Sequence, residues 1–401
     1  MMLIAVLLGC PTADKAPDDT APTNVADCSG FGLEVPSPRG EVAGVWDPLN
    51  RRFLVFGGDD GVPVECSSQT TFVDELWAFY PDCDAWELVA ATGPGPRGRH
   101  VAAYDAARER MIVYGGRYRD GTSGNYTNLD DTWAFDFATD TWTELATEGP
   151  GGRAMSVGVV GGDQFVIYGG NLSEDGGSYD SQKDAWSLDL STNTWTELSP
   201  GSGPGKRIFH AATVSSDGGT MYVYGGGDDG AFTGPFFGDL WAMDLNDPSW
   251  TELDDGSGNR VPDFRIWPNL LTKPDGNLLL WAGHDDQELG NRNDLWTYDL
   301  GGGGWEQHVE GDVYNAPANG FCDFPADFVI PDLDVPERRD AGAAAMTDDG
   351  ALLVFGGKTD CGIINDVWSW SVSDSTWSER SQATFGEICL RAYAECSTMC
   401  F

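Results

Sequence analysis

The chain has 401 residues, and 41% of them are apolar, which is enough to build a packed core and argues against a wholly disordered chain. Its 64 acidic residues outnumber 23 basic ones and give a formal net charge of −41. Such a surface repels nucleic acids and anionic lipids, which excludes both as direct partners. A solubilising acidic coat is the simplest interpretation, and bound calcium, a cationic partner or adaptation to a salty medium would also fit. The 53 glycines and 16 tryptophans favour many short strands over helices.

The chain begins with a short apolar stretch, MMLIAVLLGC, that resembles the end of a bacterial lipoprotein signal, with lipidation at Cys10. Residues 11–30, rich in Pro, Asp, Thr and Ala, are expected to be a disordered tether. We therefore expect an exported protein of the bacterial cell envelope or cell surface, held to the membrane only by its lipid.

Six apolar runs then recur along the chain, each stopping at Gly-Gly or, once, at Ala-Gly. They are FLVFGG at 53–58, MIVYGG at 111–116, FVIYGG at 165–170, MYVYGG at 221–226, LLLWAG at 278–283 and LLVFGG at 352–357. Each run predicts a strand buried on both faces. A glycine of each pair marks a point where the backbone turns or approaches a neighbour closely: Gly57, Gly115, Gly169, Gly225, Gly283 and Gly356.

Two tryptophan series follow the same period, and the second tryptophan always lies nine residues after the first. The first series is Trp77, Trp133, Trp186, Trp241, Trp296 and Trp368, and an acid stands two residues before each. Between the two tryptophans of a pair lies a short polar turn. This pattern predicts two adjacent strands with packed indoles.

A repeat of 53 to 58 residues with about four strands is typical of a β-propeller blade. These glycine pairs and spaced aromatics resemble the kelch repeat. The resemblance implies an all-β fold, a six-bladed propeller over residues 31–381 with four antiparallel strands per blade. Its tryptophans would be structural, filling the wedges between blades. The blades are expected at about 39–91, 97–147, 151–199, 205–254, 263–309 and 337–381, with an insertion at 310–336 and a Cys-rich tail at 382–401.

Eight further cysteines, an even number in a chain expected to be exported, indicate disulfides. The repeat frame predicts a Cys66–Cys83 bond within blade one and a Cys322–Cys361 bond between the insertion and blade six. Because the ends of a closed ring are neighbours, we expect Cys28 to bond one of the tail cysteines and the other two to bond each other. The tail cysteines are Cys389, Cys396 and Cys400.

One face of the propeller should collect the long loops that follow the glycine pairs, where recognition is usually found. An arginine from each blade is expected at the channel mouth on that face: Arg39, Arg97, Arg153, Arg207, Arg265 and Arg338. These arginines would either bind an anion or hold the loops and the nearby acids, and the two roles are compatible. His100, His210 and His284 lie close by in the sequence and are weaker ligand candidates. A metal site is not predicted, although the Asp-Asp-Gly turns at 59–61 and 228–230 are compatible with calcium.

The sequence favours a binding module over an enzyme, because it contains no catalytic motif. We expect a monomer that binds a protein or a glycan through its loop face. A purely structural component of the envelope is a further possibility. Two enzyme classes stay open by resemblance. One is a six-bladed mutarotase acting on sialic acid, and the other, less favoured, is a copper oxidase similar to galactose oxidase.

Overall fold

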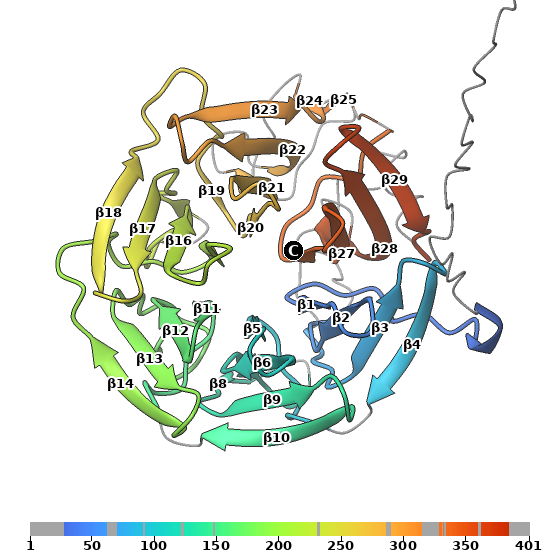
Figure 1. Ribbon diagram of the computed structural model, residues 1–401, viewed down its shortest axis with the longest axis horizontal. Coiled ribbons are helices and arrows are strands. Elements are labelled where there is room, and N and C mark those ends of the chain that lie inside the picture. The colour runs from blue at the N-terminus through green and yellow to red at the C-terminus, as the bar shows by residue number, and fades with distance from the viewer. Residues whose placement is uncertain are drawn as a thin grey trace, which may run out of the picture.

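Six blades surround a central channel in the computed structural model (Figure 1). The structure describes residues 28–61, 70–90, 93–121, 124–146, 149–230, 233–285, 290–314, 329–330, 332, 334–359 and 362–384. The first ten residues, Cys10 among them, and the tail beyond Thr384 lie outside these ranges. So do Cys66, Cys322 and Cys361. No helix in the described part of the chain has the length and apolarity needed to cross a bilayer.

Each blade is an antiparallel sheet made from consecutive strands, with its first strand at the channel and its last strand at the rim. Blade one contains β1 (Ala43–Asp47), β2 (Arg52–Phe56), β3 (Leu76–Tyr80) and β4 (Ala85–Ala90). Blade two contains β5 (Val101–Asp105), β6 (Arg110–Tyr114), β9 (Thr132–Asp136) and β10 (Thr141–Ala146). Blade three contains β11 (Val157–Gly161), β12 (Gln164–Tyr168), β13 (Ala185–Asp189) and β14 (Thr194–Leu198).

The second half of the ring repeats this order. Blade four contains β15 (Ala211–Val214), β16 (Thr220–Tyr224), β17 (Leu240–Asp244) and β18 (Ser249–Asp254). Blade five contains β20 (Asn269–Thr272), β21 (Leu278–Asp285), β22 (Gly290–Tyr298) and β23 (Trp305–Val309), and β19 (Arg265–Ile266) also pairs with β21. Blade six contains β26 (Ala343–Met346), β27 (Ala351–Thr359), β28 (Gly362–Ser371) and β29 (Thr376–Ser381). The all-β, six-bladed, four-stranded prediction is therefore confirmed.

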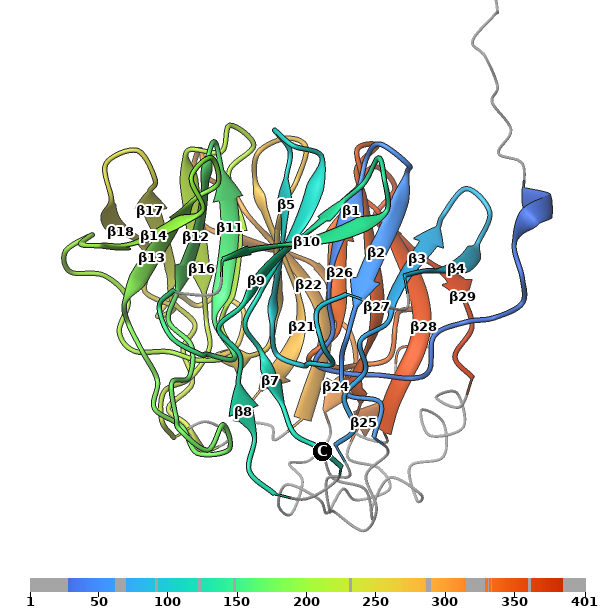
Figure 2. The ribbon, with the colours of Figure 1, turned by 90° about the horizontal axis from the view of Figure 1, so that it is seen from below.

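Short additional elements lie on the face that carries the long loops, at the bottom of Figure 2. They are the ladder of β7 (Arg117–Tyr118) with β8 (Thr127–Asn128) in blade two, and that of β24 (Val313–Tyr314) with β25 (Val329–Ile330) in the insertion. We call this the loop face and the opposite one the hairpin face. A 3-10 turn, η1 (Cys28–Gly30), opens the described chain inside the segment predicted as a tether.

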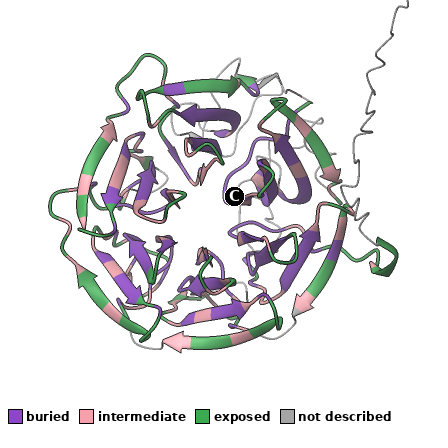
Figure 3. Cartoon of the chain, in the orientation of Figure 1, coloured by how far each residue is buried: buried purple, intermediate pink, exposed green. Residues whose placement is uncertain are grey.

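The hydrophobic core lies between the blades, where each pair of neighbours shares one apolar cluster. In β2, Phe53 and Val55 pack toward blade six, whereas Leu54 and Phe56 pack toward blade two. All four are essentially inaccessible to solvent, as expected for a strand buried on both faces. Figure 3 shows the result: the inner strands are buried and the rim strands are largely exposed.

The second tryptophan of each blade packs on the last aromatic residue of the second strand in the preceding blade. The six ring pairs, with centroids 4.9–5.6 Å apart, are Trp86–Phe355, Trp142–Phe56, Trp195–Tyr114, Trp250–Tyr168, Trp305–Tyr224 and Trp377–Trp281. Trp86 meets Phe355 across the junction of blades one and six, so the same contact closes the ring. The tryptophans therefore fill the wedges between blades, as the repeat implies.

The glycine pairs exist because the next blade approaches them closely. The second glycine N–H donates to the carbonyl of the arginine that begins the following blade, as in Gly58 to Arg97 O at 2.9 Å and, across the junction, Gly357 to Arg39 O at 2.9 Å. The first glycine has a positive φ, and a Cβ at Gly115 would lie 2.5 Å from the Arg153 carbonyl oxygen. Any side chain there would push the two blades apart.

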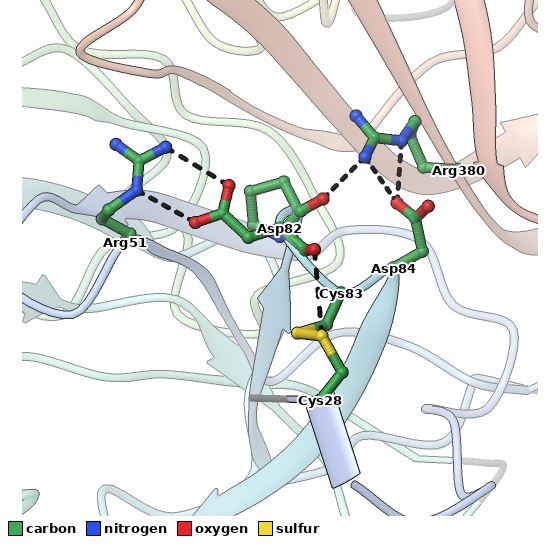
Figure 4. The surroundings of a disulfide bond; sticks show 7 residues. Cys28, Arg51, Asp82, Cys83, Asp84 and Arg380 are labelled. Carbon is green, nitrogen blue, oxygen red and sulfur yellow. Dashed lines mark hydrogen bonds and ion pairs between the residues drawn. A yellow bond between two sulfur atoms is a disulfide. The ribbon is translucent and has the colours of Figure 1, made fainter. Parts of the chain in front are cut away.

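The disulfide that the structure shows is Cys28–Cys83, which corrects both pairings predicted for these two cysteines. Cys83 lies in the turn between β3 and β4, and η1 places Cys28 against it (Figure 4). From η1 the chain continues to Pro36, whose carbonyl accepts from Asn365 in blade six. The bond therefore holds an N-terminal strap, residues 28–38, at the junction of blades one and six.

Candidate functional site

The six repeat arginines all lie inside the blades and pair with the acids that precede the first tryptophans. The N–O distances are 2.5–2.9 Å for Arg39–Glu75, Arg97–Asp131, Arg153–Asp184, Arg207–Asp239, Arg265–Asp294 and Arg339–Asp366. The same guanidiniums donate to the carbonyl of the first glycine, or of Ala282 in blade five. Each acid also accepts the indole N–H of its tryptophan. We call this unit the latch.

The sixth latch arginine is Arg339, and this corrects the alignment that placed Arg338 in the series. Arg338 instead pairs with Asp312 at 2.6 Å, which lies in the segment between blades five and six. In the latch these arginines hold the loops and the nearby acids, which is one of the two roles that the sequence suggested for them. None of the six latch arginine side chains is more than 2% exposed.

The three candidate histidines are buried, and His100 and His210 line the same small cavity. His210 Nε2 lies 3.2 Å from the Tyr168 carbonyl, which can only accept, so Nε2 carries the proton. His284 Nδ1 lies 3.1 Å from Asn291 Oδ1. No group of three or more His, Cys, Asp or Glu side chains suited to a metal occurs among the described residues. The carboxylates of Asp59 and Asp228, in the two Asp-Asp-Gly turns, accept backbone N–H groups of those turns.

The two blade histidines make stability pH-dependent. Burial, and then the charge of Arg97 or Arg207, lowers the pKa of His100 and of His210 to about 3. The unfolded chain protonates both near pH 6.5, so stability falls as pH drops below about 6.5, by up to about 1.4 kcal/mol per pH unit for each histidine. We predict that urea unfolding will show this slope between about pH 6.5 and 5 and that His100→Gln/His210→Gln will flatten it; an unchanged slope would contradict the assignment.

A second set of residues, two positions after the latch arginines, rings the mouth of the channel on the loop face. All six have a positive φ, between +51° and +62°: Glu41, Arg99, Met155, Phe209, Trp267 and Ala341. Left-handed backbone disfavours residues other than glycine, so it persists only where the surrounding structure imposes it. We call these six residues the mouth ring.

The mouth ring gathers opposite charges and aromatic rings from different blades. The Arg99 guanidinium lies 5.1 Å from the Phe209 ring centroid and 4.9 Å from that of Trp267, so a residue of blade two reaches across to blades four and five. Its Nη2 lies 2.7 Å from Glu41 Oε1. Lys358 lies over the Trp267 ring as well, at 5.9 Å. Cation–π contacts of this kind strengthen when they are shielded from water.

Glu41 forms ion pairs with the cations around the mouth ring. Lys358 Nζ lies 2.8 Å from its Oε1 and Arg117 Nη2 lies 3.3 Å from the same atom. Burial alone would raise the pKa of Glu41, but the neighbouring cations outweigh burial and hold that pKa well below its usual range. The carboxylate is therefore ionised throughout the physiological range.

Arg117 and Arg119 extend this positive region onto the β7–β8 ladder. Both guanidiniums lie over the ring of Tyr126, at 4.0 and 4.5 Å from its centroid. Burial, and then the charge of Arg99, lowers the pKa of Arg117 from its usual value. The described contacts give Arg119 no carboxylate partner. Arg119 thus adds a cation beside Arg117, over the same ring.

Among the described residues, the channel contains a small cavity and a larger one. The small one of about 130 Å³ borders the mouth ring and the layer of His100 and His210 beneath it. The larger one of about 320 Å³ borders the inner strands of all six blades, including Ala102 and Ala344. The larger cavity shares Tyr104 and Met346 with a wider opening on the hairpin face.

Comparisons with known proteins agree with this geometry. The description "KLHDC2/KLHL20/DRC7 Kelch-repeats domain" matches residues 22–216 and 159–322, and "Kelch motif" matches residues 341–382. The chain belongs to the kelch-repeat family.

Its kelch relatives include much longer proteins. The chain is 31% identical over 339 residues to "Dynein alpha chain, flagellar outer arm" of Chlamydomonas reinhardtii, an alignment covering 70% of this chain and 7% of that protein. It is 30% identical over 222 residues to "Kelch domain-containing protein 2" of Bos taurus, covering 50% of each. The solved structure titled "Structure of YjhT" superimposes with a TM-score of 0.62 at 18% identity, covering 86% of this chain and 99% of that one. At that identity the likeness shows the fold alone.

The sequence placed one arginine of each blade of the kelch propeller at the mouth of the channel, whereas the structure buries the side chains of all six predicted arginines. Arg99, Glu41 and Trp267 were not identified from the sequence, because the residue type at this position of the repeat differs from blade to blade. The available signal was their position, two residues after each latch arginine. Arg117 and Lys358 directly follow glycine pairs, so they too could have been found from the repeat frame.

Proposed function

We propose that this kelch propeller is a binding module that holds an anionic group of a protein or glycan at the mouth of its loop face. One observation carries the proposal: in a chain of net charge −41, Arg99, Arg117 and Lys358 converge on a single carboxylate. Arg119 adds a fourth cation. A local positive region on an acidic protein steers and selects anions, because the rest of the surface repels them.

The same proposal includes the location. We place the protein, exported and lipid-anchored at Cys10, at the bacterial cell envelope or cell surface. The positive region at the mouth of the loop face would then be accessible to acidic glycans or proteins outside the membrane. The long loops around the mouth would supply selectivity among them.

A sugar-processing enzyme of the mutarotase type is the second candidate, and the electrostatics of Glu41 weigh against it. General acid–base catalysis works best when the group titrates near the operating pH. Glu41, the carboxylate at the centre of the mouth, has a pKa held well below its usual range. It suits permanent charge pairing better than proton transfer.

Arg119 provides the test, because it has cation–π contact with Tyr126 but no carboxylate partner among the described contacts. Binding of acidic glycans and acidic peptides should be measured by calorimetry at two salt concentrations. Arg119→Ala should weaken binding about three- to tenfold and reduce its salt dependence. The matched control is Arg260→Ala, an exposed arginine between blades four and five, which should leave binding unchanged. Equal effects of the two variants, or no binding by the wild type, would refute the proposal.

A further inference from the structure

The carboxylate of Glu41 is bound very unevenly. Arg99, Lys358 and Arg117 all contact Oε1, at 2.7, 2.8 and 3.3 Å. Within the part of the chain that the structure describes, Oε2 is buried and has no hydrogen-bond partner, and the same is true of Nε of Arg99. Three cations thus share one oxygen of one anion. A buried polar atom without a partner costs free energy, so the arrangement leaves hydrogen-bonding capacity unused around Glu41.

The repeat does not require a carboxylate at this position. The equivalent residues of the mouth ring are Arg99, Met155, Phe209, Trp267 and Ala341, all with the same left-handed backbone. Only blade one places an acid there. The other five blades adopt the same backbone conformation without an acid at this position. The carboxylate of Glu41 therefore contributes charge and is not needed for the backbone conformation.

We propose that the carboxylate of Glu41 occupies the position of the ligand's anionic group and competes with it. The incoming carboxylate, or another oxyanion, replaces Oε1 among Arg99, Arg117 and Lys358, and Glu41 withdraws. The cavity of about 130 Å³ that borders Glu41 and Arg99 has room for an end group of a few heavy atoms. Glu41 is then a specificity-determining residue, because a weak anion cannot displace it. This inference rests on the proposed function.

Glu41→Gly tests the competition directly. The φ of +56° suits glycine, so the backbone is not strained by the change, and the lost side chain leaves a carboxylate-sized space. Acetate is the probe, compared with chloride at equal ionic strength. Removal of the internal competitor should tighten acetate binding about tenfold or more, because the cations are no longer occupied. Acetate, but not chloride, should also raise the Tm of Glu41→Gly well above the rise seen in the wild type.

Met155→Gly is the matched control, since Met155 has the same backbone conformation in blade three, with a φ of +62°. It leaves a comparable space beside only one of the three cations, Arg99, whose Nη1 lies 3.7 Å from Met155 Sδ, so acetate should stabilise it much less than Glu41→Gly. If Glu41→Gly does not fold, Glu41→Gln keeps the shape of the side chain, removes its charge and should also bind acetate more tightly than the wild type.

The outcomes separate the inference from the proposed function. If the wild type binds an acidic ligand through Arg119 but Glu41→Gly gains no acetate affinity over Met155→Gly, the competition is refuted and the function stands. If Glu41→Gly binds acetate and the wild type binds none of the acidic ligands, Glu41 is a permanent counterion, and both proposals are refuted. Weaker binding of acidic ligands by Glu41→Gly would show that Glu41 contacts the ligand, which also overturns the competition.

Discussion

Arg97→Ala is expected to lower the free energy of unfolding by about 3–5 kcal/mol. The Arg97 guanidinium makes two bonds to Asp131, at 2.7 and 2.8 Å, and one to the Gly115 carbonyl at 3.0 Å. Its removal leaves a carboxylate and a carbonyl without their buried donors, at the point where blade two meets blade three. Urea unfolding at neutral pH, followed by tryptophan fluorescence, measures the loss.

Arg260→Ala is the control for this prediction, because an exposed arginine outside the latch should change stability by no more than about 0.5 kcal/mol. The alternative left open by the sequence makes the opposite prediction. If the latch arginines served only to bind an anion, Arg97→Ala would abolish binding and leave the unfolding curve in place. That result would show that the latch contributes little to the fold.

The fold followed from the sequence because its determinants are local and repeated six times. The apolar run, the glycine pair and the spaced tryptophans of each blade interact with their own blade and with the neighbouring blades. Gly115 illustrates this: its positive φ and its approach to Arg153 depend on one junction that recurs around the ring. A sequence pattern that is repeated six times can be aligned without knowledge of the structure.

The alignment failed where a repeat position was ambiguous. Arg338 and Arg339 are adjacent, and either could have been the latch arginine of blade six by spacing. The choice depends on Asp312, which pairs with Arg338 from the segment between blades five and six. That segment occurs once in the chain, so the repeat carried no information about it.

The mouth ring shows a second limit of prediction from the sequence. Its backbone conformation is the same in every blade, yet its side chains differ, and their chemistry depends on contacts across the channel. Arg99 of blade two meets Phe209 and Trp267 of blades four and five. Such contacts join residues more than 100 positions apart, which no local pattern reveals. The candidate site was therefore predictable as a face but not as a set of residues.

The ring closes without a strand shared between the two ends of the chain, so the junction of blades one and six depends on contacts between complete blades. Trp86 packs on Phe355, Gly357 donates to the Arg39 carbonyl, and Arg380 of blade six bonds Asp84 and the Pro81 carbonyl of blade one. Figure 4 shows Arg380 beside the disulfide. The Cys28–Cys83 bond acts at this junction, because it fixes the strap that leads to Pro36.

Cys28→Ser/Cys83→Ser should therefore lower the free energy of unfolding by about 2–4 kcal/mol, the usual effect of closing a loop of this size, here a sequence separation of 55. Substituting both cysteines avoids a free thiol, and it tests this bond alone, which a reducing agent would not do in a chain with nine cysteines. Arg380→Ala is the comparison: it removes a partly exposed ion pair at the same turn and should cost no more than about 1 kcal/mol. Thermal and urea unfolding of both variants measure the difference.

Because the strap contacts blade six through Asn365, hydrogen exchange in blade six should rise in the double-serine variant. Equal stabilities of the two variants, with unchanged exchange in blade six, would mean that the blades close the ring by packing alone and that the disulfide only anchors the N-terminal strap.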